Sequence, residues 1–135
     1  MDYQVLKEKA REASKNSYSP YSNFKVGACL LLKNNVYIQG CNIENASYGL
    51  ANCAERTAMF TAYAQGYKKD DILAIAVYSP LEKLVPPCGA CCQVMNELLN
   101  KDTPVLMVYG KDLNTKEVKV KDLLPYSFSG ENLNV

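Results

Sequence analysis

The chain has 135 residues, of which 48% are hydrophobic and 21% are charged. A chain of this length buries one hydrophobic core, so we expect a single domain over residues 1–135. Fifteen basic and fourteen acidic residues leave a formal net charge of +1, and the two signs are interleaved, which argues against nucleic acid or a membrane surface as a partner.

The cysteine content and the apolar pattern indicate a compartment. We see no apolar signal segment and no run of eighteen apolar residues, so we expect a cytoplasmic protein without a membrane span. The chain has six cysteines and no histidine. In a reducing compartment, cysteines serve metal binding, catalysis or packing more often than disulfide formation.

The first third of the chain predicts a helix followed by a β-hairpin. Asp2 is a suitable cap for a helix that ends near the turn-forming residues 16–23. Residues 24–32 and 36–43 are rich in strand formers, and the turn residues between them indicate a hairpin. The apolar residues that recur at helical spacing in the first segment are Val5, Leu6, Ala10 and Ala13.

The rest of the chain predicts alternating helices and strands. Residues 53–66 and 88–99 have helical patterns, whereas residues 72–79 and 104–110 are apolar runs typical of buried strands. This order implies a three-layer α/β/α sandwich with a mixed sheet of about five strands. The mixed charges of residues 115–122 indicate a solvated surface.

Two cysteines lie at the predicted start of a helix. Cys88 and Cys91 are three positions apart, so their sulfurs can converge where the helix dipole favours thiolate. The pair alone has three interpretations, which are two zinc ligands, a redox dithiol and a chance spacing. Its late position, far from a first strand, weakens the redox interpretation. Cys53, at another predicted helix start, would add a third sulfur and leave one tetrahedral position of a zinc ion open.

We expect the other three cysteines to be small packing residues. Cys29 and Cys41 lie in or at the end of the predicted hairpin strands, where a free cysteine is usually a core side chain. Cys92 follows Cys91 directly and points about 100° away around the helix, so it does not easily share the same ion.

The residues after Cys53 carry charges that suit hydrolysis at a metal. Without histidine, a carboxylate is the natural group to move protons between water and substrate, and Glu55 is a candidate. Three thiolates and Zn²⁺ sum to −1, so a nearby cation is needed, and Arg56 lies on the same helical face as Cys53. Taken alone, a glutamate at the position of Glu55 more often stabilises a helix dipole, and Arg56 is more often an ordinary surface residue.

Three motifs together resemble a known family. The segments "CNIENASY" (41–48), "NCAERTA" (52–58) and "PCGACCQVM" (87–95) resemble those of the small homotetrameric cytidine deaminases, over about residues 18–128. The spacing of the metal ligands and the glutamate is the general signature of zinc deaminases. The resemblance implies zinc-dependent hydrolysis of cytidine and 2′-deoxycytidine to uridine and 2′-deoxyuridine with release of ammonia, in pyrimidine salvage.

The resemblance also implies roles for matching residues. It implies that Cys53, Cys88 and Cys91 bind one Zn²⁺ per chain, that Glu55 is the catalytic proton shuttle and that Arg56 offsets thiolate charge. It further implies a homotetramer whose active sites are shared between subunits. The implied substrate-binding residues are Phe24 against the pyrimidine, Asn42 and Glu44 at the ribose, Tyr48 near the shared site, the Ala54 backbone at the base edge, and Phe128 from a neighbouring subunit.

One position departs from the family pattern. The family usually has arginine after the second cysteine of the CxxC pair, whereas this chain has Cys92 there. This leaves Arg56 to balance more of the cluster's negative charge alone.

Four alternatives stay open. A deaminase of the same fold acting on another aminopyrimidine nucleoside, such as blasticidin S, is the nearest. A nucleic-acid-editing deaminase would need a basic channel. A non-catalytic zinc-binding module would need a fourth protein ligand, and a thiol oxidoreductase would form a Cys88–Cys91 disulfide.

Overall fold

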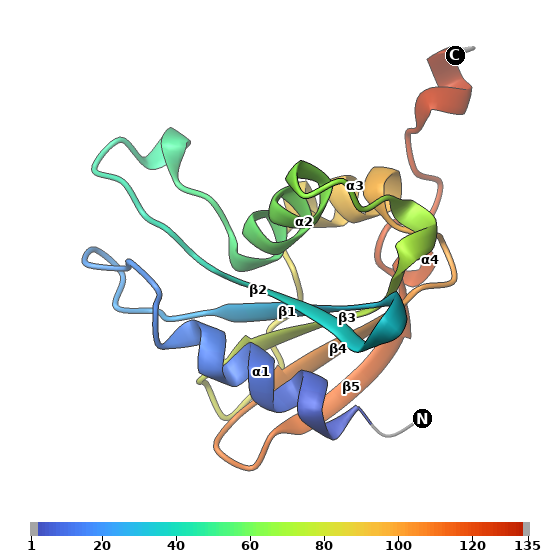
Figure 1. Cartoon of the computed structure of the whole chain (residues 1–135). Helices are drawn as coiled ribbons and strands as arrows, with labels where there is room; N and C mark the ends of the chain where they lie inside the picture. Colours follow the sequence, from blue (N-terminus) through green and yellow to red (C-terminus); the bar gives the residue numbers. More distant parts are fainter. Residues whose placement is uncertain (1–2, 134–135) are drawn as a thin grey trace.

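A five-stranded mixed sheet lies between helices on its two faces (Figure 1) in the computed structural model, which describes residues 3–133. The expected cap Asp2 lies outside the described residues. The elements in chain order are α1 (Gln4–Ser14), β1 (Gly27–Leu32), β2 (Val36–Cys41), α2 (Ala54–Ala64), β3 (Ile72–Ser79), α3 (Gly89–Leu98), β4 (Pro104–Tyr109), β5 (Asn114–Lys119) and α4 (Val120–Leu123).

The sheet order is β2-β1-β3-β4-β5. Strands β3 and β4 are parallel, and the other neighbouring pairs are antiparallel. A parallel pair needs a crossover connection, and α3 supplies it between β3 and β4. This crossover places the start of α3 just after the end of β3. The predicted three-layer α/β/α sandwich is confirmed.

Two apolar clusters hold the three layers together. One lies between the sheet and α2 with α3, and the other lies between the sheet and α1. The periodic pattern of the first helix is confirmed for Leu6, Ala10 and Ala13, which are buried, but Val5 is 52% exposed. Val5 lies one position outside the stripe that faces the sheet, so it points to solvent.

The predicted hairpin is present, but its strands are shorter than expected. Strands β1 and β2 pair from Gly27 opposite Cys41 to Leu32 opposite Val36. Asn34 and Asn35 both have positive φ, at 64° and 57°, and asparagine tolerates this conformation better than most residues. Residues 24–26 and 42–43, which were also predicted as strand, lie beyond this ladder and continue toward Cys53 and Cys88.

Strand β5 was not predicted as a strand. The expected surface position of residues 115–122 holds for the part in β5, where only Thr115 and Val118 are partly buried, but it is wrong for Val120, which is 1% exposed at the start of α4 and packs in the core. It pairs with β4 alone and forms one edge of the sheet. An edge strand with charged side chains shows little apolar alternation, so its pattern indicated only a surface.

Gly40 in β2 allows the N-terminal half of α2 to lie close to the sheet. A Cβ atom at this position would lie 2.5 Å from the amide nitrogen of Ala58 and 2.7 Å from the carbonyl oxygen of Ala54. Real Cβ contacts are not this short, so a side chain here would push α2 away from the sheet. Gly40 therefore helps to fix the position of the helix that follows Cys53.

Within residues 3–133, none of the helices combines the length and the apolar character needed to cross a membrane.

Candidate metal centre and adjoining cavity

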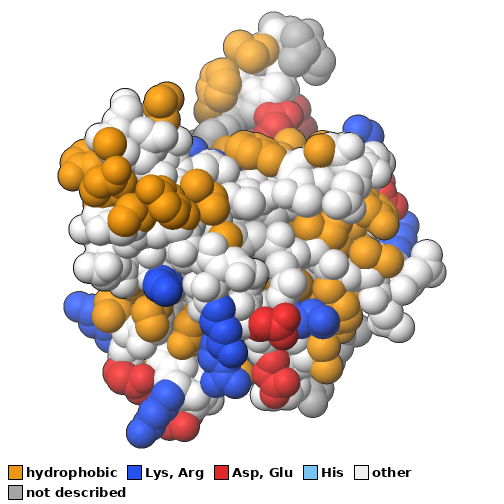
Figure 2. All heavy atoms as spheres, turned by 60° about the vertical axis from the view of Figure 1, so that its left-hand side comes forward, with side chains coloured by type: hydrophobic (Ala, Val, Ile, Leu, Met, Phe, Trp, Pro, Cys, Tyr) orange, Lys and Arg blue, Asp and Glu red, His pale blue; other side chains and the backbone are white. Residues whose placement is uncertain are grey.

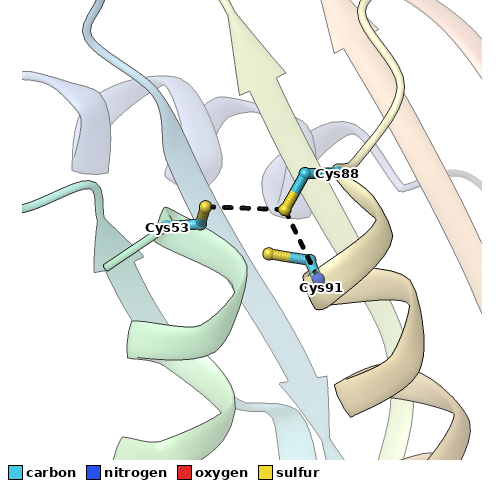
Figure 3. Close-up of side chains that lie close together, drawn as sticks. All are labelled: Cys53, Cys88 and Cys91. Atoms are coloured by element: carbon cyan, nitrogen blue, oxygen red, sulfur yellow. Dashed lines mark hydrogen bonds between the residues drawn. The ribbon is translucent and has the colours of Figure 1, made fainter. Parts of the chain in front are cut away.

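Three cysteine sulfurs meet where the N-termini of α2 and α3 approach each other (Figure 3). Cys53 is the N-cap residue of α2, Cys88 is the N-cap residue of α3, and Cys91 lies in the first turn of α3. The three sulfur atoms all lie within 4.8 Å of one another, and those of Cys53 and Cys88 are 3.8 Å apart. Cys53 comes from a distant part of the chain, so the fold creates this cluster.

The spacing of the sulfurs fits a tetrahedral zinc ion. With zinc–sulfur bonds of about 2.3 Å, two ligands of a tetrahedral site lie about 3.8 Å apart. The separation of 3.8 Å between the Cys53 and Cys88 sulfurs matches this value. Thiolate ligands also favour zinc over magnesium or calcium. Among the described residues the cluster offers three ligands, which is the number found at catalytic zinc sites.

The helix starts make the cluster suitable for thiolates. The amide N–H of Cys91 donates to the Cys88 sulfur at 3.4 Å. The hydrogen bond from Cys91 lowers the pKa of the Cys53 thiol, and Arg56 lowers it further. The pKa of Cys91 is raised, first because it donates that bond and then by burial. These contacts favour the thiolate form at Cys53, and because zinc binds thiolates, metal binding would release the protons of the thiols that hold it.

Glu55 lies next to the three sulfurs with its side chain withdrawn from solvent. It is only 4% exposed and belongs to the first turn of α2. Burial raises its pKa, and the nearby Cys53 charge raises it further, whereas the contact with the Cys91 side chain lowers it. A buried carboxyl beside a metal cluster can both accept and return a proton, so its position suits acid–base chemistry.

Arg56 provides positive charge at the cluster. Its Nη2 donates to the Cys53 sulfur at 3.3 Å, and this bond raises the pKa of the guanidinium further above its ordinary value. Its Nε atom is buried and has no hydrogen-bond partner among the described residues. Arg56 is therefore held against the Cys53 sulfur, and its buried Nε–H is left without a partner within residues 3–133.

We predict that Arg56→Gln weakens zinc binding about 10- to 100-fold, the range typical of residues that support metal ligands. The reason is that glutamine keeps a hydrogen-bond donor but removes the positive charge. Competition with a chelator measures the zinc affinity. Lys9→Gln, which removes a cation next to Tyr37, is the matched control, and equal affinities in the two variants would contradict the prediction.

A cavity of about 230 Å³ adjoins the cluster. Four residues singled out in the sequence beyond the cysteines line it, namely Phe24, Asn42, Ala54 and Glu55. Its other walls are Val26, Val77, Ser79 and residues 85–87, together with Cys53 and Cys88. The cavity thus places an aromatic ring, an amide and a buried carboxyl around a space that opens at two of the sulfurs.

The two expected ribose-binding residues lie at different hollows. Asn42 lines the cavity at the sulfurs, whereas Glu44 lines a second hollow of about 310 Å³ with Tyr48. The oxygen of Asn42 accepts from the Val26 N–H at 2.9 Å and from the Ser17 hydroxyl, and its Nδ2 donates to the Phe24 carbonyl at 2.8 Å. An amide nitrogen carries two hydrogens, so Asn42 retains one donor for a bound molecule.

Glu44 also has a structural role. Its carboxylate accepts from the amide N–H groups of Tyr21 and Ser22, at 3.0 and 3.2 Å, and from the Ser22 hydroxyl. The hydroxyl bond is the main reason that the pKa of Glu44 is lowered. Glu44 therefore stays ionised and holds the turn that precedes Phe24.

Tyr48 and Phe128 do not line the cavity at the sulfurs. Tyr48 is 77% exposed and makes an edge contact with Tyr21, with the ring centroids 6.2 Å apart. Phe128 is 56% exposed and lies in the segment that follows α4. Within one chain, these two residues are thus separate from the metal cluster.

Several cavity residues were not among the predicted site residues. Val77 and Ser79 lie at the carboxyl end of β3, and Pro86 and Pro87 form the wall before α3. The carboxyl ends of strands are common ligand sites in open α/β sheets, so the end of the predicted strand 72–79 was an available signal. Ser17, whose hydroxyl donates to the Asn42 side chain, lies in the segment after α1 and not at a strand end, so no sequence signal predicted this contact.

The other three cysteines lie outside the metal cluster. Cys29 is fully buried beneath α1, and Cys92 is 6% exposed with its thiol donating to the Pro87 carbonyl at 3.7 Å. Cys41 is partly buried at the end of β2. The expectation that Cys29 and Cys92 pack in the interior is confirmed.

Comparison with known proteins gives consistent matches along the chain. Residues 1–107 match the family described as the cytidine and deoxycytidylate deaminase zinc-binding region. The cytidine deaminase of Halalkalibacterium halodurans is 50% identical over 134 residues, which are 99% of each chain. A cytidine deaminase of Mycobacterium tuberculosis is 34% identical over 133 residues, covering 98% of this chain and 94% of that protein. The crystal structure of cytidine deaminase from Burkholderia pseudomallei has a TM-score of 0.90 and 45% identity, covering 95% of this chain and all of that chain.

Proposed function

The chain belongs to the cytidine and deoxycytidylate deaminase family, and on this premise we propose that it hydrolyses cytidine and 2′-deoxycytidine to uridine and 2′-deoxyuridine with release of ammonia. The observation that carries the proposal is the convergence of three cysteine sulfurs beside the buried carboxyl of Glu55. The names of the similar proteins support the choice of substrate over blasticidin S.

Cys53, Cys88 and Cys91 are the proposed ligands of one zinc ion per chain. Their sulfur spacing and their number support this role. When bound, zinc acts as a Lewis acid that makes water a nucleophile near neutral pH. Since the cluster offers three sulfurs among the described residues, the alternative of a closed structural zinc site lacks a fourth protein ligand.

Glu55 is the proposed proton shuttle. Water must lose a proton as its oxygen attacks C4 of the pyrimidine, ring N3 must gain one, and the amino group must leave as neutral ammonia. A single carboxyl next to the reacting atoms can accept one proton from the attacking water and pass it to N3. It can then accept the second proton from the hydroxyl formed at C4 and pass it to the leaving nitrogen, so that both protons of water are used. The burial that raises the pKa of Glu55 favours its protonated form between these transfers.

The cavity residues are proposed to bind the nucleoside. The Phe24 ring provides an apolar surface for the pyrimidine, and the backbone at Ala54 faces the base edge. Asn42 has one donor left for a ribose hydroxyl. Glu44 is proposed to accept from the ribose as well, although its oxygens also hold residues 21–22.

A homotetramer with shared active sites is the proposed assembly. Five exposed apolar residues, Tyr18, Tyr21, Ile43, Tyr48 and Leu50, belong to two projecting loops. Figure 2 shows hydrophobic side chains gathered on this side of the molecule. Large exposed apolar patches mark interaction sites. In this assembly Phe128 and Tyr48, which lie outside the cavity of their own chain, would reach an active site between subunits.

The whole chain is proposed to act as one domain in the cytoplasm, in pyrimidine salvage. Its six cysteines are free, which agrees with a reducing compartment.

Ultraviolet monitoring of the purified protein with cytidine tests the activity. We expect a loss of cytidine absorbance that disappears after zinc is removed by a chelator and returns when zinc is added. Parallel reactions with 2′-deoxycytidine and blasticidin S measure the substrate range. If the zinc-loaded protein leaves both cytidine nucleosides unchanged, the proposed function is wrong.

A further inference from the structure

The segment after α4 is fastened to α3 at one carbonyl group. The side-chain amide of Gln93 donates to the carbonyl oxygen of Phe128 at 2.9 Å, and that of Asn96 donates to the same oxygen at 3.3 Å. Gln93 and Asn96 are three positions apart, so their side chains lie on one face of α3. Two donors from one helix thus hold a single backbone atom of this segment, in which Phe128 itself is exposed.

The burial of Asn96 indicates that its amide serves this contact. Asn96 is 5% exposed, and its Oδ1 has no hydrogen-bond partner among the described residues. An unpaired buried acceptor is unfavourable, and an apolar side chain of similar size would avoid it. If the only role of residue 96 were to pack α3 against its neighbours, an apolar side chain would therefore be more favourable than an amide. The amide nitrogen of Asn96 is used, since it donates to the Phe128 carbonyl.

The ring of Phe128 stays available although its backbone is held. The residue is 56% exposed and does not line the cavity at its own chain's sulfurs. The N-terminal end of α3 carries Cys88 and Cys91. One helix therefore carries two of the sulfurs at the cavity and also holds the backbone of Phe128, whose ring is exposed.

We propose that Gln93 and Asn96 are positioning residues that hold the Phe128 ring for the active site of a neighbouring subunit. This inference rests on the proposed function, in which Phe128 completes a shared site. A ring already fixed in place loses less conformational freedom when a nucleoside stacks on it, so binding is tighter. We call the Gln93 and Asn96 amides that hold the Phe128 carbonyl the clamp. Because the Phe128 ring would contact substrate and transition state alike, the clamp acts on KM and leaves kcat nearly unchanged.

Leucine substitutions test the clamp. Gln93→Leu and Asn96→Leu should each raise KM for cytidine roughly 3- to 10-fold with kcat nearly unchanged, since ordering one side chain is worth this much. Gln39→Leu is the matched control, because Gln39 also donates to a backbone carbonyl at 2.9 Å, that of Lys9 on α1. An unchanged KM in both α3 variants of an active enzyme would overturn the inference.

A tryptophan reporter tests the same contact without using activity. The chain has no tryptophan, so Phe128→Trp places a single tryptophan on the fastened segment. In this background Gln93→Leu and Asn96→Leu should lower the fluorescence anisotropy and increase quenching by acrylamide, whereas Gln39→Leu should change neither. Unchanged anisotropy in the α3 variants would show that the amides do not hold residue 128.

Mixed assemblies test whether the clamp acts between subunits. A chain carrying Glu55→Ala, with its clamp intact, is co-expressed with a chain carrying Gln93→Leu and Asn96→Leu, and hybrids are isolated through two tags. We expect hybrids to contain sites with the wild-type KM, because one chain supplies Glu55 and the other a fixed Phe128. If all active sites keep the high KM of the variant, the effect lies within one chain and the inference is wrong. Absence of cytidine turnover by the wild-type protein would instead refute the proposed function.

Discussion

Glu55→Ala should reduce kcat for cytidine by at least the roughly 10²- to 10⁴-fold that general acid–base catalysis contributes. The zinc content should stay at that of the wild type, because Glu55 is not part of the sulfur cluster. The loss follows from the position of Glu55, whose carboxyl contacts the Cys91 side chain and lines the cavity. Kinetics and metal analysis on the same preparation separate the two effects.

Glu55→Gln distinguishes a catalytic from a structural role. Glutamine has a similar shape but cannot transfer the proton, so we expect a similar loss of kcat. Burying an amide is less unfavourable than burying a carboxylate, so the melting temperature should not fall. Glu12→Gln, which changes an exposed carboxylate on α1, should leave both quantities unchanged. A zinc-loaded Glu55→Gln protein with normal turnover would remove Glu55 from the mechanism.

The sequence predicts those parts of the fold in which one periodicity dominates. Ala54, Ala58, Met59 and Ala62 repeat at helical spacing and are all fully buried in α2. Strand β3 was predicted with its observed limits, because a short continuous apolar run is typical of a strand covered on both faces. Strand β5 was missed since its pairing with β4 leaves most of its side chains in water, and their charges carry no strand signal.

The metal cluster was predictable because helix geometry brings two of its three ligands together. Cys88 and Cys91 share one helix start, so their convergence follows from spacing, and the third ligand was then sought at another helix start. The contacts of Asn42 were not predictable, because Ser17, Phe24 and Val26 meet it only through the fold. The clamp on Phe128 was hidden for the same reason, since it joins positions 32 and 35 residues apart.

Cys88→Ser should abolish stoichiometric zinc binding and, with it, cytidine turnover. Cys88 is exposed, so the exchange of sulfur for oxygen disturbs little packing and removes mainly a ligand. A ligand present at a thousand times its dissociation constant stabilises the folded state by about 4 kcal/mol. For a chain of this size that corresponds to a fall in melting temperature of roughly 10–15 °C.

Two comparisons assign this stabilisation to the metal. Cys41→Ser changes a thiol outside the cluster and should keep zinc, activity and melting temperature. Wild-type protein stripped by a chelator should melt like Cys88→Ser, and added zinc should restore only the wild type. If zinc also raised the melting temperature of Cys88→Ser fully, another group would replace the lost sulfur, and Cys92→Ser in that background would show whether it is the neighbouring thiol. Such replacement would mean that the three-sulfur site proposed here is not what holds the metal.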